Sequence, residues 1–172
     1  KDFWLSVWNT LWMVGITSIL AGFLGLMVGY VVMRVPVKIV GSFLRHVTFL
    51  PYLVPQIVFA AAVLSLFAVP RGPVPALYGT PWILLIAMTA SEMPFATRSG
   101  IASMIQLGKD PEEAAQIAGA GWVKRMVRVL VPIQKGSIVA GILMPFISGI
   151  KGLSLVVLLA VPGTDLMTTY SI

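Results

Sequence analysis

The chain has 172 residues, of which 58% are hydrophobic and only 10% charged, and its mean hydropathy is +0.96. Soluble domains carry about 25% charged residues, so this composition argues strongly against a soluble enzyme. The absence of cysteine excludes disulfides, thiolate metal sites and thiol nucleophiles, and a single histidine argues against a histidine-rich metal site. Twelve Lys and Arg against six Asp and Glu indicate membrane topology rather than nucleic-acid binding. The composition predicts an integral membrane protein.

Long stretches without charge indicate membrane-spanning helices, since about 20 apolar residues cross a bilayer as a helix. Residues 3–33, 47–70 and 72–91 contain no charged side chain. We therefore predict helices near Asn9–Met33, Val47–Val69, Pro75–Met93 and Ile133–Ile150, the third continuing toward Met104 as an amphipathic helix.

Beyond the fourth predicted helix, Leu153–Val161 is apolar but too short to span a bilayer alone, and Pro162–Asp165 predicts a turn. No signal peptide is expected, because the apolar run that starts at Phe3 is too long for one. The chain starts with Lys and lacks a further long apolar run. We therefore expect residues 1–172 to form a single transmembrane domain that is part of a longer polypeptide.

Small residues and prolines mark positions where helices approach closely or bend. Gly25 and Gly29 form a GxxxG pattern, with a weaker pair at Ser137 and Gly141, and both favour close packing, more within the chain than between chains. Prolines in or beside the second and third predicted spans could kink helices where a gate moves, although plain curvature is the alternative. These prolines are Pro51, Pro55 and Pro94.

The distribution of Lys and Arg predicts the orientation in the membrane. Segments 34–45 and 98–135 fall on the same side of the predicted helices and together hold nine of these residues, against three on the other side. Because positive residues concentrate in cytoplasmic loops, both segments are predicted to be cytoplasmic and the N-terminus to be outside. Trp4, Trp8 and Trp12 lie on one helix face and predict either an outer interfacial anchor or packing against a partner helix.

The polar segment 98–135 contains one well-delimited short helix. Asp110, Pro111 and Glu113 predict an N-cap, a first-turn proline and a capping box, and Gly119 with Gly121 predicts the helix end. The helix has little side-chain bulk, since it consists largely of alanines with Ile117. Such a narrow helix fits a groove on another protein; packing on its own helix ends is the alternative.

This segment resembles the EAA loop of ABC importer permeases. Glu113-Ala-Ala is followed after three residues by Gly119 and, after nine more, by Val129-Leu-Val-Pro132, in the register Glu-Ala-Ala-x3-Gly-x9-Ile-x-Leu-Pro. Val129 and Val131 replace Ile and Leu conservatively. The resemblance implies an all-α, polytopic helical bundle of the five-helix permease core, with its last helix apparently missing here and a short cytoplasmic coupling helix.

In that family the EAA helix docks in a cleft of a cytoplasmic ATPase. By resemblance, Glu113 would face a basic group of the ATPase, while Ala114, Ala115 and Ala118 would fit the cleft and Gly119 would allow a sharp turn. The implied coupling set is Asp110, Pro111, Glu112, Glu113, Ala114, Ala115, Ile117, Ala118, Gly119, Ala120 and Pro132. The implied partners are an ATPase dimer, a second permease half and an extracytoplasmic solute-binding protein, in a bacterial or archaeal cytoplasmic (inner) membrane. Whether that second half is a copy, a paralogue or part of the same chain stays open.

No chemistry is expected in the chain itself. Leu107-Gly-Lys-Asp110 lacks the features of a phosphate-binding loop, so no cofactor is expected here, and ATP and Mg²⁺ would be bound by the partner ATPase. The segment 151–172 resembles the ferric-iron branch of the family, with polyamine, thiamine, sulfate and phosphonate as other candidate substrates. The alternative functions are an ion-gradient-driven transporter that uses Glu92, or a membrane channel or structural subunit. The alternative role for Glu92 is a hydrogen bond to Thr89 or to a neighbouring helix.

Overall fold

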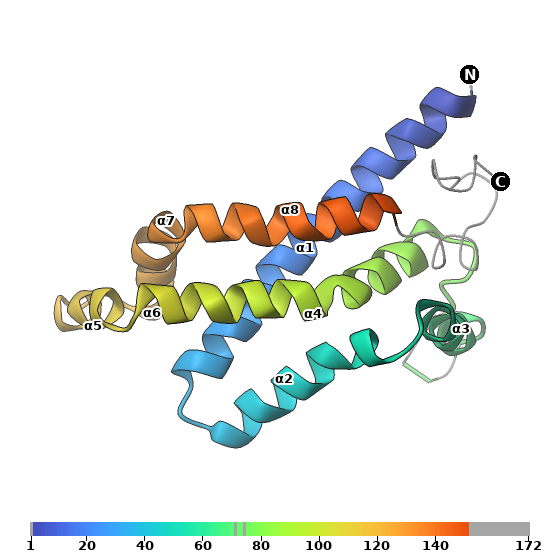
Figure 1. Cartoon of the computed structure of the whole chain (residues 1–172). Helices are drawn as coiled ribbons and strands as arrows, with labels where there is room; N and C mark the ends of the chain where they lie inside the picture. Colours follow the sequence, from blue (N-terminus) through green and yellow to red (C-terminus); the bar gives the residue numbers. More distant parts are fainter. Residues whose placement is uncertain (1, 71, 74, 152–172) are drawn as a thin grey trace.

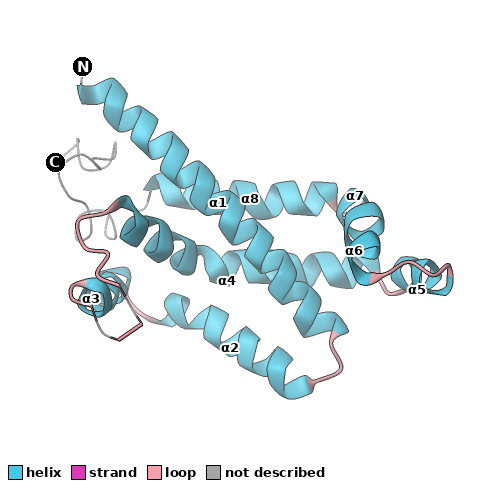
Figure 2. Ribbon diagram, turned by 180° about the vertical axis from the view of Figure 1, so that it is seen from behind, coloured by secondary structure: helices cyan, strands magenta, loops and turns pink. Residues whose placement is uncertain are grey.

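The computed structural model describes residues 2–70, 72–73 and 75–151, and every regular element within these ranges is helical (Figures 1 and 2). The all-α prediction is therefore confirmed. The elements are α1 (Asp2–Arg34), α2 (Lys38–Leu53), α3 (Gln56–Phe67), α4 (Pro81–Leu107), α5 (Asp110–Ile117), α6 (Trp122–Arg125), the π-helical turn η1 (Met126–Leu130), α7 (Val131–Ile133) and α8 (Lys135–Lys151). The predicted short apolar run at 153–161, the turn at 162–165 and the segment that resembles the ferric-iron branch lie outside the described residues, apart from Lys151 itself.

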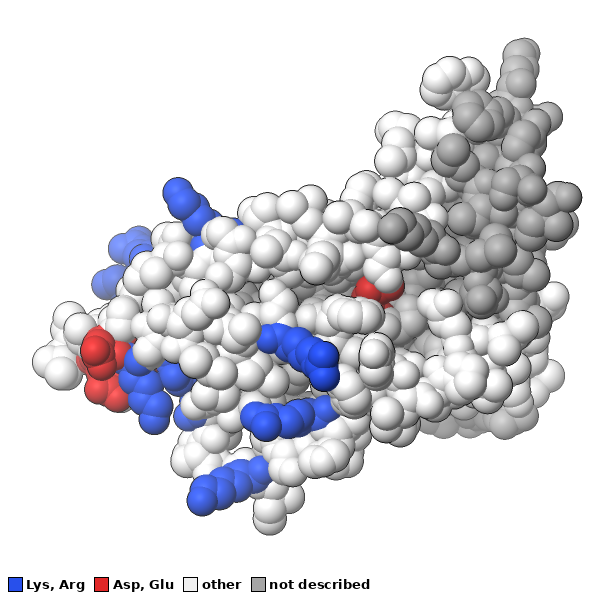
Figure 3. All heavy atoms as spheres, in the orientation of Figure 1, with Lys and Arg blue, Asp and Glu red and all other residues white. Residues whose placement is uncertain are grey.

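One end of the bundle gathers the polar elements. The turn between α1 and α2 lies at the same end as α5, α6 and α7 (Figure 1). Lys and Arg side chains concentrate over this half of the molecule, and the acidic side chains of α5 lie at its tip (Figure 3). This agrees with the expectation that segments 34–45 and 98–135 share one side. Arg45 and Arg98, however, lie within helices α2 and α4 and not in loops.

Helices α1 and α4 touch almost backbone to backbone. A Cβ added at Gly25 would collide with the backbone of Ala96, and one added at Gly29 with that of Gly100. Glycine permits this approach because no side chain separates the two helices. The prediction that the GxxxG pattern packs within the chain is confirmed. The weaker pair takes part too, since an added Cβ at Gly141 of α8 would lie 2.9 Å from Ser99 Oγ.

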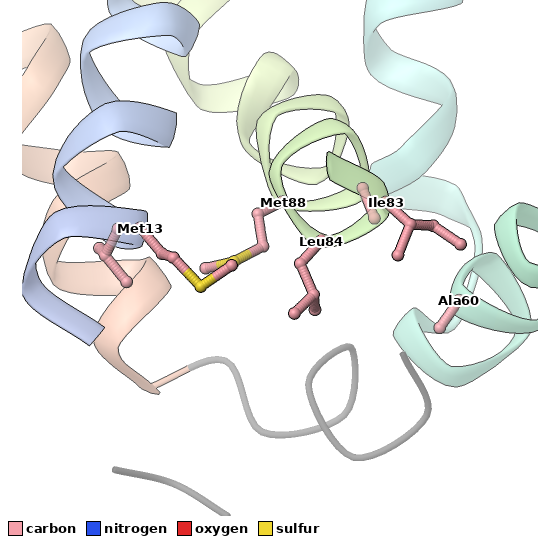
Figure 4. Close-up of a cluster of buried hydrophobic side chains, with 7 residues drawn as sticks. Met13, Ala60, Ile83, Leu84 and Met88 are labelled. Carbon is pink, nitrogen blue, oxygen red and sulfur yellow. The ribbon is translucent and has the colours of Figure 1, made fainter. Parts of the chain in front are cut away.

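Two apolar clusters stabilise the bundle at opposite ends. Toward the N-terminal end of α4, side chains from α1, α3 and α4 pack together (Figure 4); they are Met13, Val14, Ala60, Ile83, Leu84, Ala87 and Met88. Trp12 packs against this cluster, whereas Trp4 and Trp8 are exposed. At the polar end, α1, α4 and η1 contribute Leu26, Tyr30, Met104, Met126 and Leu130. The second cluster therefore fixes η1 against the ends of α1 and α4.

The second predicted span is broken, so the expectation of one helix over Val47–Val69 is wrong. Helix α2 begins earlier, at Lys38, and ends at Leu53; α3 then departs from it at 111°. The cause is Pro55, which has no N–H to continue the helix and disfavours a helical conformation in the residue before it. Val54 is accordingly extended, with φ −101° and ψ 132°. Pro51 is accommodated within α2.

The third and fourth predicted helices also have different bounds. Helix α4 starts at Pro81 instead of Pro75, after an extended Thr80, and continues through the buried Pro94 to Leu107. The first ten residues of the predicted polar segment 98–135 thus belong to α4. The fourth helix is preceded by the helical segment Trp122–Ile133, which meets it at 77°.

By length and composition, Val7–Arg34 is the one described helix that can cross a membrane unaided. Each of the two bent pairs, α2 with α3 and Trp122–Ile133 with Lys135–Ile150, would add one span if the pair crosses as a unit. Helix α4 has 27 residues but includes Glu92, Arg98 and several Ser and Thr side chains. The four uniformly apolar spans expected from the sequence are therefore replaced by one such span, two bent pairs and a more polar central helix.

Candidate functional site

The short helix α5 is separated from α4 by a tight turn. Gly108 ends α4 with φ +68°, a backbone conformation that glycine adopts without strain, and its N–H donates to the Ile105 carbonyl at 3.2 Å. The chain then enters α5 at Asp110. The turn places α5 at the tip of the polar end of the bundle (Figure 1).

The predicted capping box at the start of α5 is wrong. The N-cap residue is Lys109, and it makes no side-chain cap. The N–H groups of Glu112 and Glu113, which a capping side chain would bind, both donate to the Lys109 carbonyl at 3.0 Å. Asp110, Glu112 and Glu113 still fill the first turn with negative charge, which stabilises the positive end of the helix dipole.

The predicted end of α5 is confirmed at Gly119. This residue has φ +80°, and its N–H donates to the Gln116 carbonyl at 2.9 Å. The Ala120 N–H donates to the Ala115 carbonyl, also at 2.9 Å. These two bonds form a Schellman motif, in which a left-handed residue closes the helix and satisfies its last carbonyls.

The inner face of α5 is fastened to α1 by a buried ion pair. Arg34 Nε donates to Glu112 Oε2 at 3.1 Å, and the two side chains are only 9% and 11% exposed. The same guanidinium donates to the carbonyls of Met104 and Gly108 at the end of α4. A cation at a helix C-terminus and an anion at a helix N-terminus both match the helix dipoles. Arg34 and Glu112 therefore connect three helix ends.

Further side chains join the Arg34–Glu112 pair. Tyr30 Oη donates to Glu112 Oε1 at 2.7 Å. Arg125 Nε lies 3.7 Å from the same oxygen, within ion-pair range but without a hydrogen bond. The ring of Trp122 meets Tyr30 edge-on, with 6.2 Å between centroids. We call Tyr30, Arg34, Glu112, Trp122 and Arg125 the anchor cluster.

The outer face of α5 is exposed and has little side-chain bulk. Ala114, Ile117 and Ala118 lie three and four positions apart, hence on one face, and Ile117 is 88% exposed. Glu113 is also exposed, next to the buried Glu112. The remaining residues of the predicted coupling set are placed as follows: Asp110 and Gly119 are exposed, Pro111, Ala115 and Ala120 are half-buried, and Pro132 is exposed in α7, outside α5.

Most of the anchor cluster was not predicted from the sequence. Arg34 and Arg125 entered only the count of Lys and Arg that predicts topology, and Glu112 was placed with Glu113 on one docking surface. Neighbouring residues of a helix point about 100° apart, so two consecutive glutamates cannot face the same partner. That spacing indicates that the two glutamates point in different directions, but it does not identify which one faces inward or which residue it contacts.

A second missed residue is Gln134, at the bend before α8. Its side chain is 4% exposed, and Nε2 donates to the Ser103 carbonyl of α4 at 2.8 Å. This bond ties the bend to α4.

Glu92, the acidic residue considered for ion coupling, lies in α4 and is 6% exposed. It does not bond Thr89, whose hydroxyl has no partner among the described residues; instead its carboxyl interacts with Ser148 of α8. The expectation of a bond to a neighbouring helix is therefore the one that the structure supports.

Comparisons with known proteins agree with these features. A family model described as "Binding-protein-dependent transport system inner membrane component" matches residues 4–172. The chain is 29% identical over 168 residues to a protein of Haemophilus influenzae named as a putative ferric transport system permease, covering 97% of this chain. It is 28% identical over 167 residues, again 97% of this chain, to a ferric transport system permease of Actinobacillus pleuropneumoniae. It spans about a quarter of each relative's length, 26% and 24% respectively.

Among solved structures, an inward-facing methionine ABC transporter matches with a TM-score of 0.66. The match covers 84% of this chain and 68% of the other, at 19% sequence identity. At this identity the likeness concerns the fold, and it confirms the expected permease architecture.

Proposed function

Because the chain belongs to the family of binding-protein-dependent transport system inner membrane components, we propose that it is a permease half of an ATP-driven importer. In this proposal α5 is the coupling helix, which docks in a cleft of a cytoplasmic ATPase. A second permease half and an extracytoplasmic solute-binding protein complete the assembly. ATP and Mg²⁺ are bound by the ATPase, and this chain contributes the path across the membrane.

The observation that carries the proposal is the division of α5 into two faces. Its inner face is held by the buried Arg34–Glu112 pair, and its outer face presents Ala114, Ile117 and Ala118 to the surroundings. Full burial of one isoleucine side chain contributes about 1.5–3 kcal/mol, whereas an exposed ion pair at Glu113 would add about 0–1 kcal/mol. Docking would therefore depend mainly on shape and apolar burial.

A firmly held docking helix also explains how force would reach the membrane helices. Docking must be stronger in one nucleotide state of the ATPase than in the other to move the permease. Displacement of α5 would be passed through Glu112 to Arg34 at the end of α1, and through the Arg34–Gly108 contact to α4. This assignment places α5 and the positive end of the bundle in the cytoplasm, in accordance with the excess of Lys and Arg there.

We propose ferric iron as the substrate, on the strength of the two similar permeases whose names include ferric transport. Polyamine, thiamine, sulfate and phosphonate remain the candidates to compare. The test is uptake into vesicles that contain the full transporter and its ATPase, with each solute delivered by its binding protein. ATP-dependent accumulation of iron that persists after the proton gradient is collapsed is expected. Uptake driven by an ion gradient without ATP would contradict the proposal.

Docking is tested by disulfide crosslinking in a transporter whose native cysteines outside residues 1–172 are replaced; residues 1–172 themselves contain none. Glu113→Cys is paired with a single cysteine in the ATPase cleft, and Tyr78→Cys, exposed in the loop between α3 and α4, serves as the control. We expect a crosslink from Glu113→Cys whose yield differs between nucleotide-free and ATP-trapped states. Equal yields from the two variants, or none from Glu113→Cys in either state, would show that α5 is not the coupling helix.

A further inference from the structure

A cavity of about 700 Å³ lies between α2 and α4 on the face where Lys and Arg side chains gather (Figure 3). Its walls include Phe49 and Leu53 of α2, Ile101 and Ile105 of α4, and Met33 of α1. Ligand sites in proteins typically measure about 300–1,000 Å³ and combine apolar walls with a few polar groups. In size and wall chemistry the cavity resembles a ligand site.

The polar side chains that line this cavity are basic or uncharged, and none is acidic. Arg45 and His46 of α2 and Arg98 of α4 line it. Neither arginine forms an ion pair within the described part of the chain. The two acidic side chains that are buried among the described residues are engaged elsewhere: Glu92 interacts with Ser148 of α8, and Glu112 belongs to the anchor cluster. The cavity therefore has an uncompensated positive field.

Aromatic contacts hold one of the arginines in place. The guanidinium carbon of Arg98 lies 4.9 Å from the centroid of the Phe49 ring. Tyr52 packs on Phe49 at 5.1 Å and on Phe95 of α4 at 6.0 Å, joining the two helices beside the cavity. A cation–π contact of this kind fixes the position of a guanidinium without pairing its charge with an acidic group.

We propose that the α2–α4 cavity binds a phosphate-type oxyanion through Arg45 and Arg98. The planar fork of donors on arginine matches the oxygens of such groups, and positive charge above apolar walls concentrates anions. The oxyanion is either a free solute or the phosphate of an anionic lipid headgroup. This inference goes beyond the proposed function and does not depend on coupling to an ATPase, because the site lies within this chain and its test uses no nucleotide.

The field in the cavity is measured by thiol modification. Ala102, an exposed lining residue, is replaced in the full-length protein as Ala102→Cys and placed in phosphatidylcholine nanodiscs. An anionic methanethiosulfonate reagent should react faster than a cationic one by about tenfold, after normalisation to a free thiol. Adding Arg45→Gln and Arg98→Gln should remove this preference. Lys38→Gln, an exposed charge outside the cavity lining, should retain it.

Ligand protection identifies the source of the oxyanion. Slower modification in the presence of inorganic phosphate identifies a free oxyanion, and slower modification after adding phosphatidylglycerol to the discs identifies a lipid headgroup. Arg98→Lys, which keeps the charge but not the fork, should keep the reagent preference and weaken protection. This variant keeps the test decisive if the double arginine variant fails to fold. Equal rates for both reagents, or no protection by either phosphate source, would overturn the proposal.

Discussion

Replacement of Glu112 by alanine is the sharpest perturbation of the anchor cluster. The carboxylate is 11% exposed and accepts hydrogen bonds from Arg34 at 3.1 Å and Tyr30 at 2.7 Å. Removing one partner of a buried ion pair typically costs about 3–5 kcal/mol. Arg34 would keep its bonds to the Met104 and Gly108 carbonyls, so we place Glu112→Ala at the lower end, about 3 kcal/mol. The change should release α5 from α1 and not unfold the bundle.

The release is measured by hydrogen exchange of amides over 110–121, with the protein in nanodiscs. Since 1.36 kcal/mol corresponds to a factor of ten, about 3 kcal/mol predicts exchange faster by about 100-fold or more. Glu113→Ala is the matched control, because it removes the same group from the adjacent exposed position and should change exchange less than about threefold. If both variants exchange alike, the ion pair does not hold α5 and the reasoning from burial is wrong.

Three further substitutions test the anchor cluster and the backbone contacts around it. Tyr30→Phe removes the hydroxyl that donates to the Glu112 carboxylate. A hydrogen bond to a charged group contributes about 1.5–3 kcal/mol, so amide exchange in α5 should become at least about tenfold faster. An unchanged exchange rate would contradict this expectation. Gly100→Ala should lower the free energy of unfolding by about 1–3 kcal/mol, because the added Cβ collides with the backbone of α1. Gly15→Ala is the control, because its Cβ meets open space. Equal melting temperatures for the two variants would argue against the close contact between α1 and α4. Gly119→Ala places a side chain at φ +80° and should destabilise the end of α5 by about 1–2 kcal/mol. The amides of residues 114–117 should then exchange faster with solvent. Gly121→Ala is the control and should have little effect, because Gly121 has φ −63°.

Several local rules predicted the structure correctly, although the capping box at Asp110 did not form. Uncharged runs predicted helical membrane segments, Gly119 predicted the end of α5, and the spacing of Gly25 and Gly29 predicted a close helix contact. Pro55 was recognised as a potential kink, but its effect was underestimated, because the 111° turn combines its missing N–H with the extended Val54.

Features that depend on tertiary contacts could not be predicted from local patterns. The ion pair of Glu112 with Arg34 joins positions 78 residues apart, and nothing in the short acidic stretch distinguishes Glu112 from Glu113. Gln134 likewise looks like an ordinary polar residue until its bond to the Ser103 carbonyl is seen. In both cases the partner lies on another helix, and only the packing of that helix decides which polar side chain turns inward.

The glycine contact between α1 and α4 limits which parts of the bundle can move independently. Where two backbones touch, no intervening layer of side chains can change rotamer to absorb sliding or rotation. Helices α1 and α4 should therefore tilt together, so that a displacement at Arg34 also moves the far end of α1 near Met13 and that of α4 near Leu84. Relative motion is then left to the elements that are not locked in this way, above all α3 beyond the sharp turn at Pro55.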